Sequence, residues 1–368
     1  SEMCIRDRNK NYVDLKDQPV PEGQHLLEVD DLKMYFHTED GVVRAVDGVS
    51  YTLDRGETLG VVGESGSGKS VTAMTIMGLI SMPPGKIEGG DVRYRGRSIL
   101  EMTEEEMQHI RGNDIAMIFQ DPMTSLNPVY KIGKQVGEGL RLHRGYSKQE
   151  ALKRATELLD LVGIPEPEKR VNEYPHQFSG GMRQRVMIAM ALACDPDILI
   201  ADEPTTALDV TIQAQIIELM QEMQEKNGNA IIMITHDLGV VADMADKIMV
   251  MYAGRPVEFG TAEEIFYESR HPYTWGLIRS IPEQAIDEKK PLTPIHGNPP
   301  SLMNLPEGCV FSPRCPYATD KCRKQRPERV VTESGHYSAC HYSGDPEFLK
   351  NAPETSRTRK DSKKGGEA

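Results

Sequence analysis

Short apolar runs alternate with longer amphipathic stretches between about residue 25 and residue 260 of the chain. The runs "TLGVV" (58–62), "DILIAD" (197–202) and "AIIMIT" (230–235) have the length and the apolar character of buried strands. Each run is followed by a polar or glycine-containing turn and then by a stretch with helical spacing. Strands and helices that alternate in this way predict an α/β domain with a mainly parallel central sheet.

The strand pattern disappears between about residues 121 and 195, where helical spacing replaces it. The clearest amphipathic segment is "SKQEALKRATELLDLVG" (147–163). Its apolar residues recur every three or four positions, which places them on one face of a helix. The predicted buried face consists of Leu152, Ala155, Leu158, Leu159 and Val162. This stretch therefore indicates a helical subdomain inserted into the α/β domain.

The two ends and the region after Gly260 differ in composition from the main domain. Residues 1–24 and 346–368 are polar, and we expect them to be disordered. Residues 1–8 also resemble a translated sequencing-adaptor artefact, so Cys4 carries no functional prediction. Prolines become frequent after Gly260, and four cysteines appear there. The sequence therefore predicts a main domain over residues 25–262, a separate extension over 263–345 and a disordered tail.

Charge and hydropathy argue against several classes of protein. The 368 residues carry a net charge of −13, the opposite of the balance expected for a nucleic-acid-binding domain, so no nucleic-acid partner is expected. No apolar run approaches the roughly 18 residues that cross a bilayer, and the N-terminus lacks the apolar core of a secretory signal. We expect a cytosolic protein with reduced cysteines, which reaches a membrane only through another subunit.

The segment "VVGESGSGKS" (61–70) has the spacing of a phosphate-binding loop between a predicted strand and a predicted helix. Glycines let the backbone wrap closely around phosphates, and the helix N-terminus adds free N–H groups. Lys69 is expected to reach the β- and γ-phosphates, and the Ser70 hydroxyl to bind Mg²⁺. The predicted nucleotide contacts on this loop are Gly63, Glu64, Ser65, Gly66, Ser67, Gly68, Lys69, Ser70 and Val71.

Two acidic residues stand next to each other at the end of an apolar run. Asp202 is the last residue of "DILIAD", and Glu203 follows it directly. Asp202, at the end of the predicted strand, suits a Mg²⁺ partner, either directly or through water. Glu203 is placed to orient and deprotonate the water that attacks the γ-phosphate. An acid pair after a strand is also a common helix cap, so this prediction depends on the phosphate-binding loop.

The segment "FSGGMRQRVMIAMALACDP" (178–196) resembles the signature motif of the ATPases of ABC transporters. Phe178 and Met182 stand where many members of that family have Leu and Gln. The resemblance implies that Ser179, Gly180 and Gly181 bind the γ-phosphate of ATP held by an opposite ATPase subunit. This chain is therefore expected to function as a pair of ATPase domains with ATP between them.

The remaining motifs of the family follow in order, and the resemblance covers about residues 26–260. It implies that Gln120 binds Mg²⁺ and joins the ATP site to the membrane subunit. It also implies that Asp209 contacts the partner domain and that His236 touches the γ-phosphate. Phe36 is the predicted residue that stacks on adenine, with Tyr35 as the alternative. The implied fold is a P-loop NTPase domain with a mainly parallel sheet, an antiparallel β-subdomain and a helical subdomain at about 121–195.

The region after Gly260 narrows the expected substrate. "HPYTWGLIRSIP" (271–282) and the cysteine-containing segment after it resemble the C-terminal extension of the oligopeptide, dipeptide and nickel import ATPases. The resemblance implies two transmembrane permease subunits, a second ATPase subunit and an extracytoplasmic peptide-binding protein as partners, at the cytoplasmic face of the membrane. A nickel importer or another ABC transporter is the alternative, and a soluble ABC ATPase acting on DNA or ribosomes is the alternative from a different class.

The four cysteines of the extension predict a metal centre. Cys309, Cys315, Cys322 and Cys340 have the spacing C-x5-C-x6-C-x17-C. Structural zinc sites usually contain a tighter cysteine pair, whereas a four-cysteine [4Fe–4S] cluster tolerates longer spacings. The resemblance also favours the cluster, with zinc and four unligated thiols as alternatives. Because the cysteines are far from the phosphate-binding loop along the chain, we expect no direct part for the extension in hydrolysis. Cys194 is expected to be a core residue.

Overall fold

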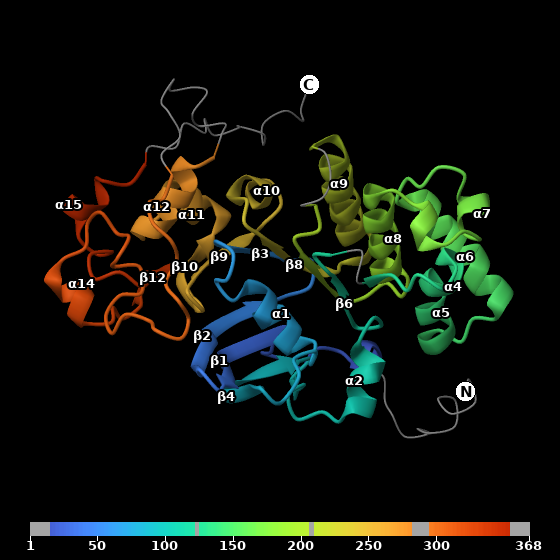
Figure 1. The fold of residues 1–368 in the computed structure, drawn as a ribbon, viewed down its shortest axis with the longest axis horizontal. Coiled ribbons are helices and arrows are strands. Elements are labelled where there is room, and N and C mark those ends of the chain that lie inside the picture. The colour runs from blue at the N-terminus through green and yellow to red at the C-terminus, as the bar shows by residue number, and fades with distance from the viewer. Residues whose placement is uncertain (1–14, 122–124, 206–209, 282–293, 354–368) are drawn as a thin grey trace.

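The computed structural model describes residues 15–121, 125–205, 210–281 and 294–353 (Figure 1). The central feature is an eight-stranded sheet with the order β11-β12-β10-β9-β3-β8-β7-β6. Strands β9, β3, β8, β7 and β6 are parallel, as the sequence predicts, and β10, β12 and β11 continue the sheet in antiparallel fashion. The strands are β3 (Thr58–Val62), β6 (Ile115–Ile118), β7 (Ile198–Asp202), β8 (Ala230–Thr235), β9 (Lys247–Tyr252), β10 (Arg255–Thr261), β11 (Val330–Val331) and β12 (Tyr337–Ser338).

Both faces of the parallel strands are buried, which explains why they are continuous apolar runs. Successive residues of one strand pack into different cores: Ile198 and Ile200 join the core under the antiparallel sheet, whereas Leu199 joins the core under the helical subdomain. The helices beside these strands are α1 (Lys69–Ile76), α2 (Glu104–Ile110), α9 (Val210–Asn227), α10 (Leu238–Ala242) and α11 (Ala262–Tyr267). None of the helices in the described ranges is long and apolar enough to span a bilayer.

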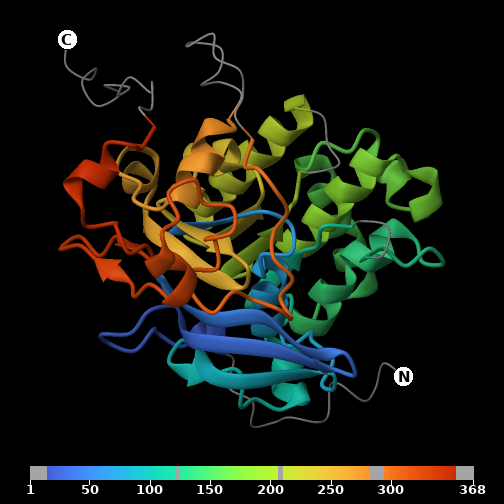
Figure 2. The ribbon, with the colours of Figure 1, turned by 60° about the vertical axis from the view of Figure 1, so that its left-hand side comes forward.

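A separate antiparallel sheet with the order β2-β1-β4-β5 lies against one side of the central sheet (Figures 1 and 2). Its strands are β1 (Leu27–Thr38), β2 (Gly41–Leu53), β4 (Gly85–Tyr94) and β5 (Arg97–Ser98). Leu15, in the 3-10 helix η1 (Leu15–Asp17), is 1% exposed in the same core, and the Lys16 ammonium donates to the carbonyl of Cys194 over 3.1 Å. The prediction that residues 15–24 are disordered is therefore wrong, because η1 supplies an apolar side chain to this core.

The helical subdomain occupies the opposite side of Figure 1 from the C-terminal extension. Its helices are α4 (Ile132–Val136), α5 (Glu138–His143), α6 (Lys148–Leu161), α7 (Pro167–Arg170) and α8 (Gly180–Leu192), with the 3-10 helix η2 (Pro175–Gln177) before α8. Ser147 caps α6 in a capping box with Glu150, as its sequence suggests. On α6, Ala151 is buried, whereas Leu152, which was predicted to be buried, is 40% exposed.

The C-terminal extension packs onto the β10 edge of the sheet (Figure 2). It contains α12 (Pro272–Arg279), α14 (Asp320–Lys324) and α15 (Pro346–Leu349). The fully buried carboxylate of Glu258, on β10, accepts hydrogen bonds from the backbone N–H of His271 over 3.2 Å and lies 3.0 Å from His336 Nε2. Disorder is predicted from residue 346 onward, but residues 346–349 form α15, and Phe348 packs on Trp275 at a ring separation of 5.3 Å.

We predict that the buried carboxylate of Asp197, just before β7, is a main link between the two sheets. It binds Arg95 Nη2 at 2.5 Å and the Tyr94 hydroxyl at 2.7 Å, and both Asp197 and Arg95 are at most 6% exposed. Asp197→Ala leaves the Arg95 guanidinium buried without its partner, which costs about 3 kcal/mol or more. Urea unfolding should show this loss as a lower midpoint.

A suitable control is Glu157→Ala, which breaks the exposed pair between Arg154 and Glu157 (38% and 48% exposed). Exposed pairs contribute at most about 1 kcal/mol, so this variant should unfold close to the parent. Equal midpoints for Asp197→Ala and Glu157→Ala would contradict the prediction.

Candidate active site

The phosphate-binding loop connects β3 to α1 and is clamped between two neighbouring strands. Gly63 has φ 153°, and a Cβ there would lie 2.2 Å from the carbonyl oxygen of Met251. Gly68 has φ 99°, and a Cβ there would lie 2.3 Å from the carbonyl oxygen of Ala45. No other residue fits these two positions, because the loop backbone directly abuts β9 and β2.

Lys69 lies inside the curve of this loop and is 5% exposed. Its ammonium donates hydrogen bonds to the carbonyl oxygens of Gly63 over 2.7 Å and Glu64 over 2.9 Å. Burial lowers the pKa of Lys69, and the carboxylates of Glu203, Asp202 and Glu64 oppose that change. The loop therefore presents a desolvated cation where the sequence predicts the β- and γ-phosphates.

Ser70 and Asp202 meet at the first turn of α1. The Ser70 hydroxyl donates to Asp202 Oδ1 over 2.9 Å, and Asp202 is 4% exposed at the end of β7. Burial raises the pKa of the Asp202 carboxyl above its usual range, and the Ser70 hydrogen bond opposes that change. A hydroxyl and a carboxylate side by side are hard oxygen donors of the kind that Mg²⁺ prefers, so these residues fit the predicted ion.

Glu203 is the meeting point of three loops at the carboxyl ends of β6, β7 and β8. Its Oε2 accepts a hydrogen bond from Gln120 Nε2 over 2.9 Å, and its Oε1 lies 3.3 Å from His236 Nδ1. The Glu203 backbone has φ 46°, a left-handed conformation that is strained for a residue other than glycine. Two side chains predicted separately from sequence, those of Gln120 and His236, thus lie next to the Glu203 carboxylate.

The signature segment begins α8. Ser179 caps the helix, and its Oγ accepts a hydrogen bond from the Met182 backbone over 3.3 Å. Among the described residues, no hydrogen bond or ion pair joins Ser179 to the phosphate-binding loop of the same chain. The helix connects to the catalytic region by another route, because the buried side chain of Gln184 donates to the carbonyl of Pro204 over 2.7 Å.

Of the two remaining residues predicted at the nucleotide site, the structure describes only one. Phe36 lies near the end of β1, half-buried, and pairs with Val43 of β2. Its alternative Tyr35 is engaged elsewhere, since its hydroxyl donates to Asp47 Oδ1 over 3.0 Å. This difference favours Phe36 as the aromatic residue for adenine. Asp209 lies outside the described residues.

The C-terminal extension reaches the phosphate-binding loop, although the two are far apart along the chain. The Arg314 guanidinium pairs with the Glu64 carboxylate, with Nη1 2.6 Å from Oε2. The Glu64 backbone N–H donates to the Tyr273 hydroxyl over 2.9 Å. Sequence reasoning missed both contacts, because partners 250 and 209 positions apart leave no local pattern.

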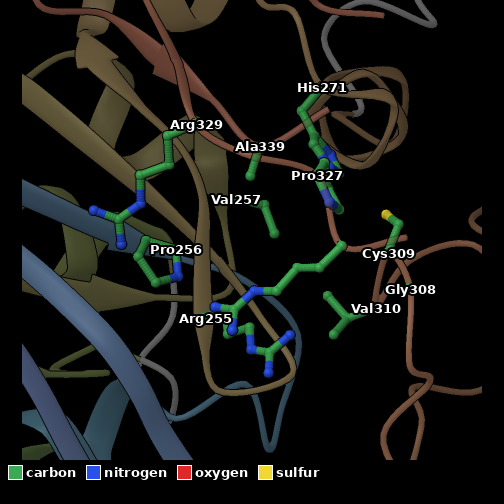
Figure 3. A pocket seen from close by; sticks show the side chains of 11 residues that line it. Arg255, Pro256, Val257, His271, Gly308, Cys309, Val310, Pro327, Arg329 and Ala339 are labelled. Atoms are coloured by element: carbon green, nitrogen blue, oxygen red, sulfur yellow. The ribbon is translucent and has the colours of Figure 1, made fainter. Parts of the chain in front are cut away.

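The extension also contacts β2, beside a cavity of about 50 Å³ (Figure 3). Arg329 of the extension donates a hydrogen bond to the carbonyl of Gly48. Beside it, Arg255 of β10 pairs with Asp47 of β2, with Nη2 2.6 Å from Oδ2. Figure 3 places Cys309 at the far side of this cavity from Arg329. The extension therefore contacts the core at β2 as well as at the phosphate-binding loop.

The four cysteines of the extension converge on one cavity with aromatic walls, lined by Cys309, Cys315, Cys322, Cys340, Phe311, Tyr317, Tyr342 and Phe348 among others. Burial raises the pKa of the Cys309 thiol, that of Cys315 to about 11 and that of Cys340 to about 12. Within the described ranges, no group of three or more His, Cys, Asp or Glu side chains is placed to hold a metal ion. Four cysteine thiols are suitable ligands for a metal centre, but in this structure they are not close enough together to form one. Cys194 is 2% exposed in the main core, as predicted.

Solved structures confirm the class of protein. The chain is similar to the ATP-binding cassette MJ0796, solved as a dimer in a post-hydrolysis state with ADP and Pi, at a TM-score of 0.59 and 29% identity. The match covers 64% of this chain and 98% of that one. A family model described as "ABC transporter" matches residues 46–206. The fold and the site define an ATPase of the ATP-binding cassette class.

Sequence relatives identify the family more closely. The "Oligopeptide/dipeptide transporter, C-terminal region" family model matches residues 257–322. The chain is 58% identical over 312 residues to the Oligopeptide transport ATP-binding protein OppD of Bacillus subtilis (strain 168), covering 85% of this chain and 87% of that protein. It is 52% identical over 320 residues to the Dipeptide transport ATP-binding protein DppD of Escherichia coli (strain K12), covering 87% and 97%. The chain belongs to the oligopeptide/dipeptide family of ABC transporter ATP-binding proteins.

We predict that Asp202→Asn stabilises the nucleotide-free protein at neutral pH. The raised pKa means that the folded state disfavours the charged carboxyl, so stability falls as pH rises from the ordinary value of 3.8 through the folded-state pKa. Asparagine does not titrate, and its side-chain oxygen still accepts from Ser70. Thermal unfolding of the variant at pH 7 should shift upward by a few degrees.

The stability advantage of Asp202→Asn should shrink as the pH is lowered toward the ordinary carboxyl pKa. Ser70→Ala serves as the matched control, because it removes the hydrogen bond and keeps the charge. A parent protein that is more stable than Asp202→Asn at pH 7 would contradict the prediction.

Proposed function

We propose that this chain is the ATP-hydrolysing subunit of an ABC importer that drives peptide uptake across the cytoplasmic membrane. The observation that carries the proposal is the cluster of Gln120, Glu203 and His236 at the carboxyl edge of the sheet, beside the phosphate-binding loop. An extension of the oligopeptide/dipeptide type follows the same cassette. Relatives named for oligopeptide and dipeptide transport support the substrate class.

In the proposed mechanism, the loop 63–71 wraps the phosphates with backbone N–H groups, and Lys69 contacts the β- and γ-phosphates. Phe36 stacks on adenine. When bound, Mg²⁺ neutralises charge on the phosphates, and Ser70, Asp202 and Gln120 are the residues that would hold it. These side chains orient the γ-phosphate for in-line attack.

Glu203 orients a water molecule and accepts its proton as that water attacks the γ-phosphate. Gln120 donates to one Glu203 oxygen, which orients the carboxylate. His236, 57% exposed beside the other oxygen, is free to turn toward the γ-phosphate. The strained backbone of Glu203 holds the carboxylate in this place.

A second ATPase subunit completes the site in this proposal. Ser179 caps the helix α8, and Gly180 and Gly181 are its first residues, whose backbone N–H groups suit an anion. In the described part of the chain, no hydrogen bond joins these residues to the phosphate-binding loop. These three residues would contact the γ-phosphate of the partner subunit, and Asp209 would contact the partner domain. The dimeric state of the solved cassette MJ0796 supports this arrangement.

The membrane partners follow from the same proposal. Two transmembrane permease subunits receive the motion of the closing ATPase pair through the region after Gln120, and an extracytoplasmic peptide-binding protein supplies the substrate. The chain then works peripherally, at the cytoplasmic face of the membrane.

For the four cysteines we propose a [4Fe–4S] cluster, with zinc as the alternative. Convergence of all four thiols on one cavity supports a shared ligand. The raised thiol pKa values mean that a metal must displace protons on binding, and the spacing in this structure means that the segment must rearrange around it. The bound group would supply ligand bonds that add to the aromatic packing of the extension.

Glu203→Gln should leave ATP binding nearly intact and reduce ATP hydrolysis at least about a hundredfold, since a general base contributes about 10²–10⁴. Glutamine has the shape of glutamate and keeps contacts with Gln120 and His236, so the site geometry is preserved. The measurement is ATP turnover by the complex purified with its membrane partners, together with uptake of labelled peptides into vesicles.

Lys69→Ala is the comparison variant, because it should instead lose ATP affinity in calorimetry. Hydrolysis by Glu203→Gln near the parent rate would place the base elsewhere. ATP-driven uptake of nickel salts in place of peptides would reject the substrate assignment while leaving the ATPase assignment intact.

Anaerobically purified protein should contain about four irons per chain, with matching sulfide, and Cys315→Ser should lose them. Because the ligand bonds stabilise the extension, limited proteolysis should then cut it more readily after residue 294. Elemental analysis and the proteolysis pattern are the measurements.

Cys194→Ser is the control, since that thiol lies in the main core away from the cysteine cavity. Stoichiometric zinc without iron would overturn the cluster assignment. Metal-free parent protein with the same proteolysis pattern as Cys315→Ser would overturn the metal centre itself.

A further inference from the structure

One buried ion pair joins the C-terminal extension to the phosphate-binding loop. Arg314 Nη1 lies 2.6 Å from Glu64 Oε2, and Nη2 lies 3.0 Å from Glu64 Oε1. The Arg314 side chain is 4% exposed and that of Glu64 is 29% exposed. Paired parallel hydrogen bonds of this kind fix both the distance and the orientation of the two groups.

Every N–H of the Arg314 guanidinium has an acceptor. Besides the two bonds to Glu64, Nε donates to the carbonyl of His296 over 2.9 Å and Nη2 to that of Ile295 over 3.2 Å. Nη1 also lies 3.3 Å from the Tyr252 hydroxyl at the end of β9. The planar guanidinium, with five donors, is therefore fixed by three separate segments, which a lysine ammonium cannot reproduce.

A second residue of the extension holds the backbone at the same point of the loop. The Glu64 N–H donates to the hydroxyl of Tyr273, on α12, over 2.9 Å. The Tyr273 ring is fully buried and packs on Tyr252 and Phe311 at 4.6 and 5.3 Å. Side chain and backbone of Glu64 are thus both fixed by residues outside the cassette's own loop.

The ion pair also changes the charge that the loop presents to an anion. Glu64 is adjacent to the first glycine of the loop, and its carbonyl accepts a hydrogen bond from Lys69. A carboxylate without a partner here would repel phosphates and would compete with them for Lys69. Arg314 neutralises that carboxylate and directs it toward the extension.

We propose that Arg314 and Tyr273 are positioning residues for nucleotide binding, so that ATP affinity depends on the docked extension. This inference rests on the proposed assignment of residues 63–71 as the phosphate-binding loop. Neither residue touches the nucleotide; both act through Glu64. The extension thereby controls the charge and the conformation of a loop that lies in the cassette.

The cysteine-containing segment determines where Arg314 stands. Arg314 lies between Cys309 and Cys315, in a turn held by hydrogen bonds from the N–H of Cys315 to Phe311 and from that of Cys309 to Cys322. A change that unfolds this turn removes the guanidinium from Glu64. The cassette's affinity for ATP therefore reports whether the extension is folded.

The test compares ATP binding, by calorimetry, in full-length Arg314→Gln, Glu64→Gln and the double variant. Arg314→Gln should weaken binding about tenfold, because it leaves the Glu64 charge unpaired beside the phosphates. Adding Glu64→Gln to Arg314→Gln should restore most of the affinity that Arg314→Gln loses, because the double variant no longer carries the unpaired charge. Arg314→Lys should recover only part, since it lacks the planar pair of donors.

Arg279→Gln is the matched control, because Arg279 also lies in the extension but donates to Asn351 there. It should bind ATP like the parent. Tyr273→Phe is a second variant that removes one hydroxyl and should weaken binding about threefold. If Arg314→Gln does not purify in folded form, as judged by thermal unfolding, Tyr273→Phe decides the question alone.

Unchanged affinity in both Arg314→Gln and Tyr273→Phe, with Lys69→Ala weakened, overturns this inference and leaves the ATP site in place. Equal loss in Arg314→Gln and the double variant also overturns it, because the effect then comes from general damage and not from the Glu64 charge. Unchanged affinity in Lys69→Ala would reject the loop assignment, and the inference with it.

Discussion

The site depends on how closely the phosphate-binding loop lies against its neighbouring strands. Carbonyl oxygens of Met251 and Ala45 stand where any Cβ on Gly63 or Gly68 would have to be. With the backbone held from outside in this way, Lys69 fills the inside of the loop. The loop conformation is therefore set by the sheet before any nucleotide arrives, which is the preorganisation that an anion site requires.

The parallel sheet also brings the side chains proposed for hydrolysis together. Because β6, β7 and β8 run in one direction, the residues that follow them meet at one edge of the sheet. There Gln120 and His236 lie next to the two oxygens of the Glu203 carboxylate. Burial of both sheet faces, under the antiparallel sheet on one side and the helical subdomain on the other, keeps these strands rigid. The placement of the Glu203 carboxylate, the proposed general base, thus follows from strands whose apolar side chains are buried in the two cores.

The C-terminal extension is part of the same structural unit as the central sheet. It adds β12 to the sheet beside β10, packs around the buried carboxylate of Glu258, and holds Glu64 through Arg314. A segment that is far away along the chain thereby contacts the phosphate-binding loop directly. Its cysteines line a cavity of their own, close to the turn that carries Arg314.

Local spacing along the chain predicts the strands, the phosphate-binding loop and the order of the motifs at the nucleotide site, because apolar runs, glycines at fixed offsets and acids after a strand are patterns between near neighbours. The same local reasoning placed Leu152 on the buried face of α6 and residues 15–24 and 346–353 in disordered ends, since local polarity does not reveal a core supplied by distant segments. The contacts of Arg314 and Tyr273 with Glu64, in contrast, come from the tertiary structure alone. Contacts between residues more than 200 positions apart depend on how the sheet folds the chain back on itself, and no local pattern encodes them.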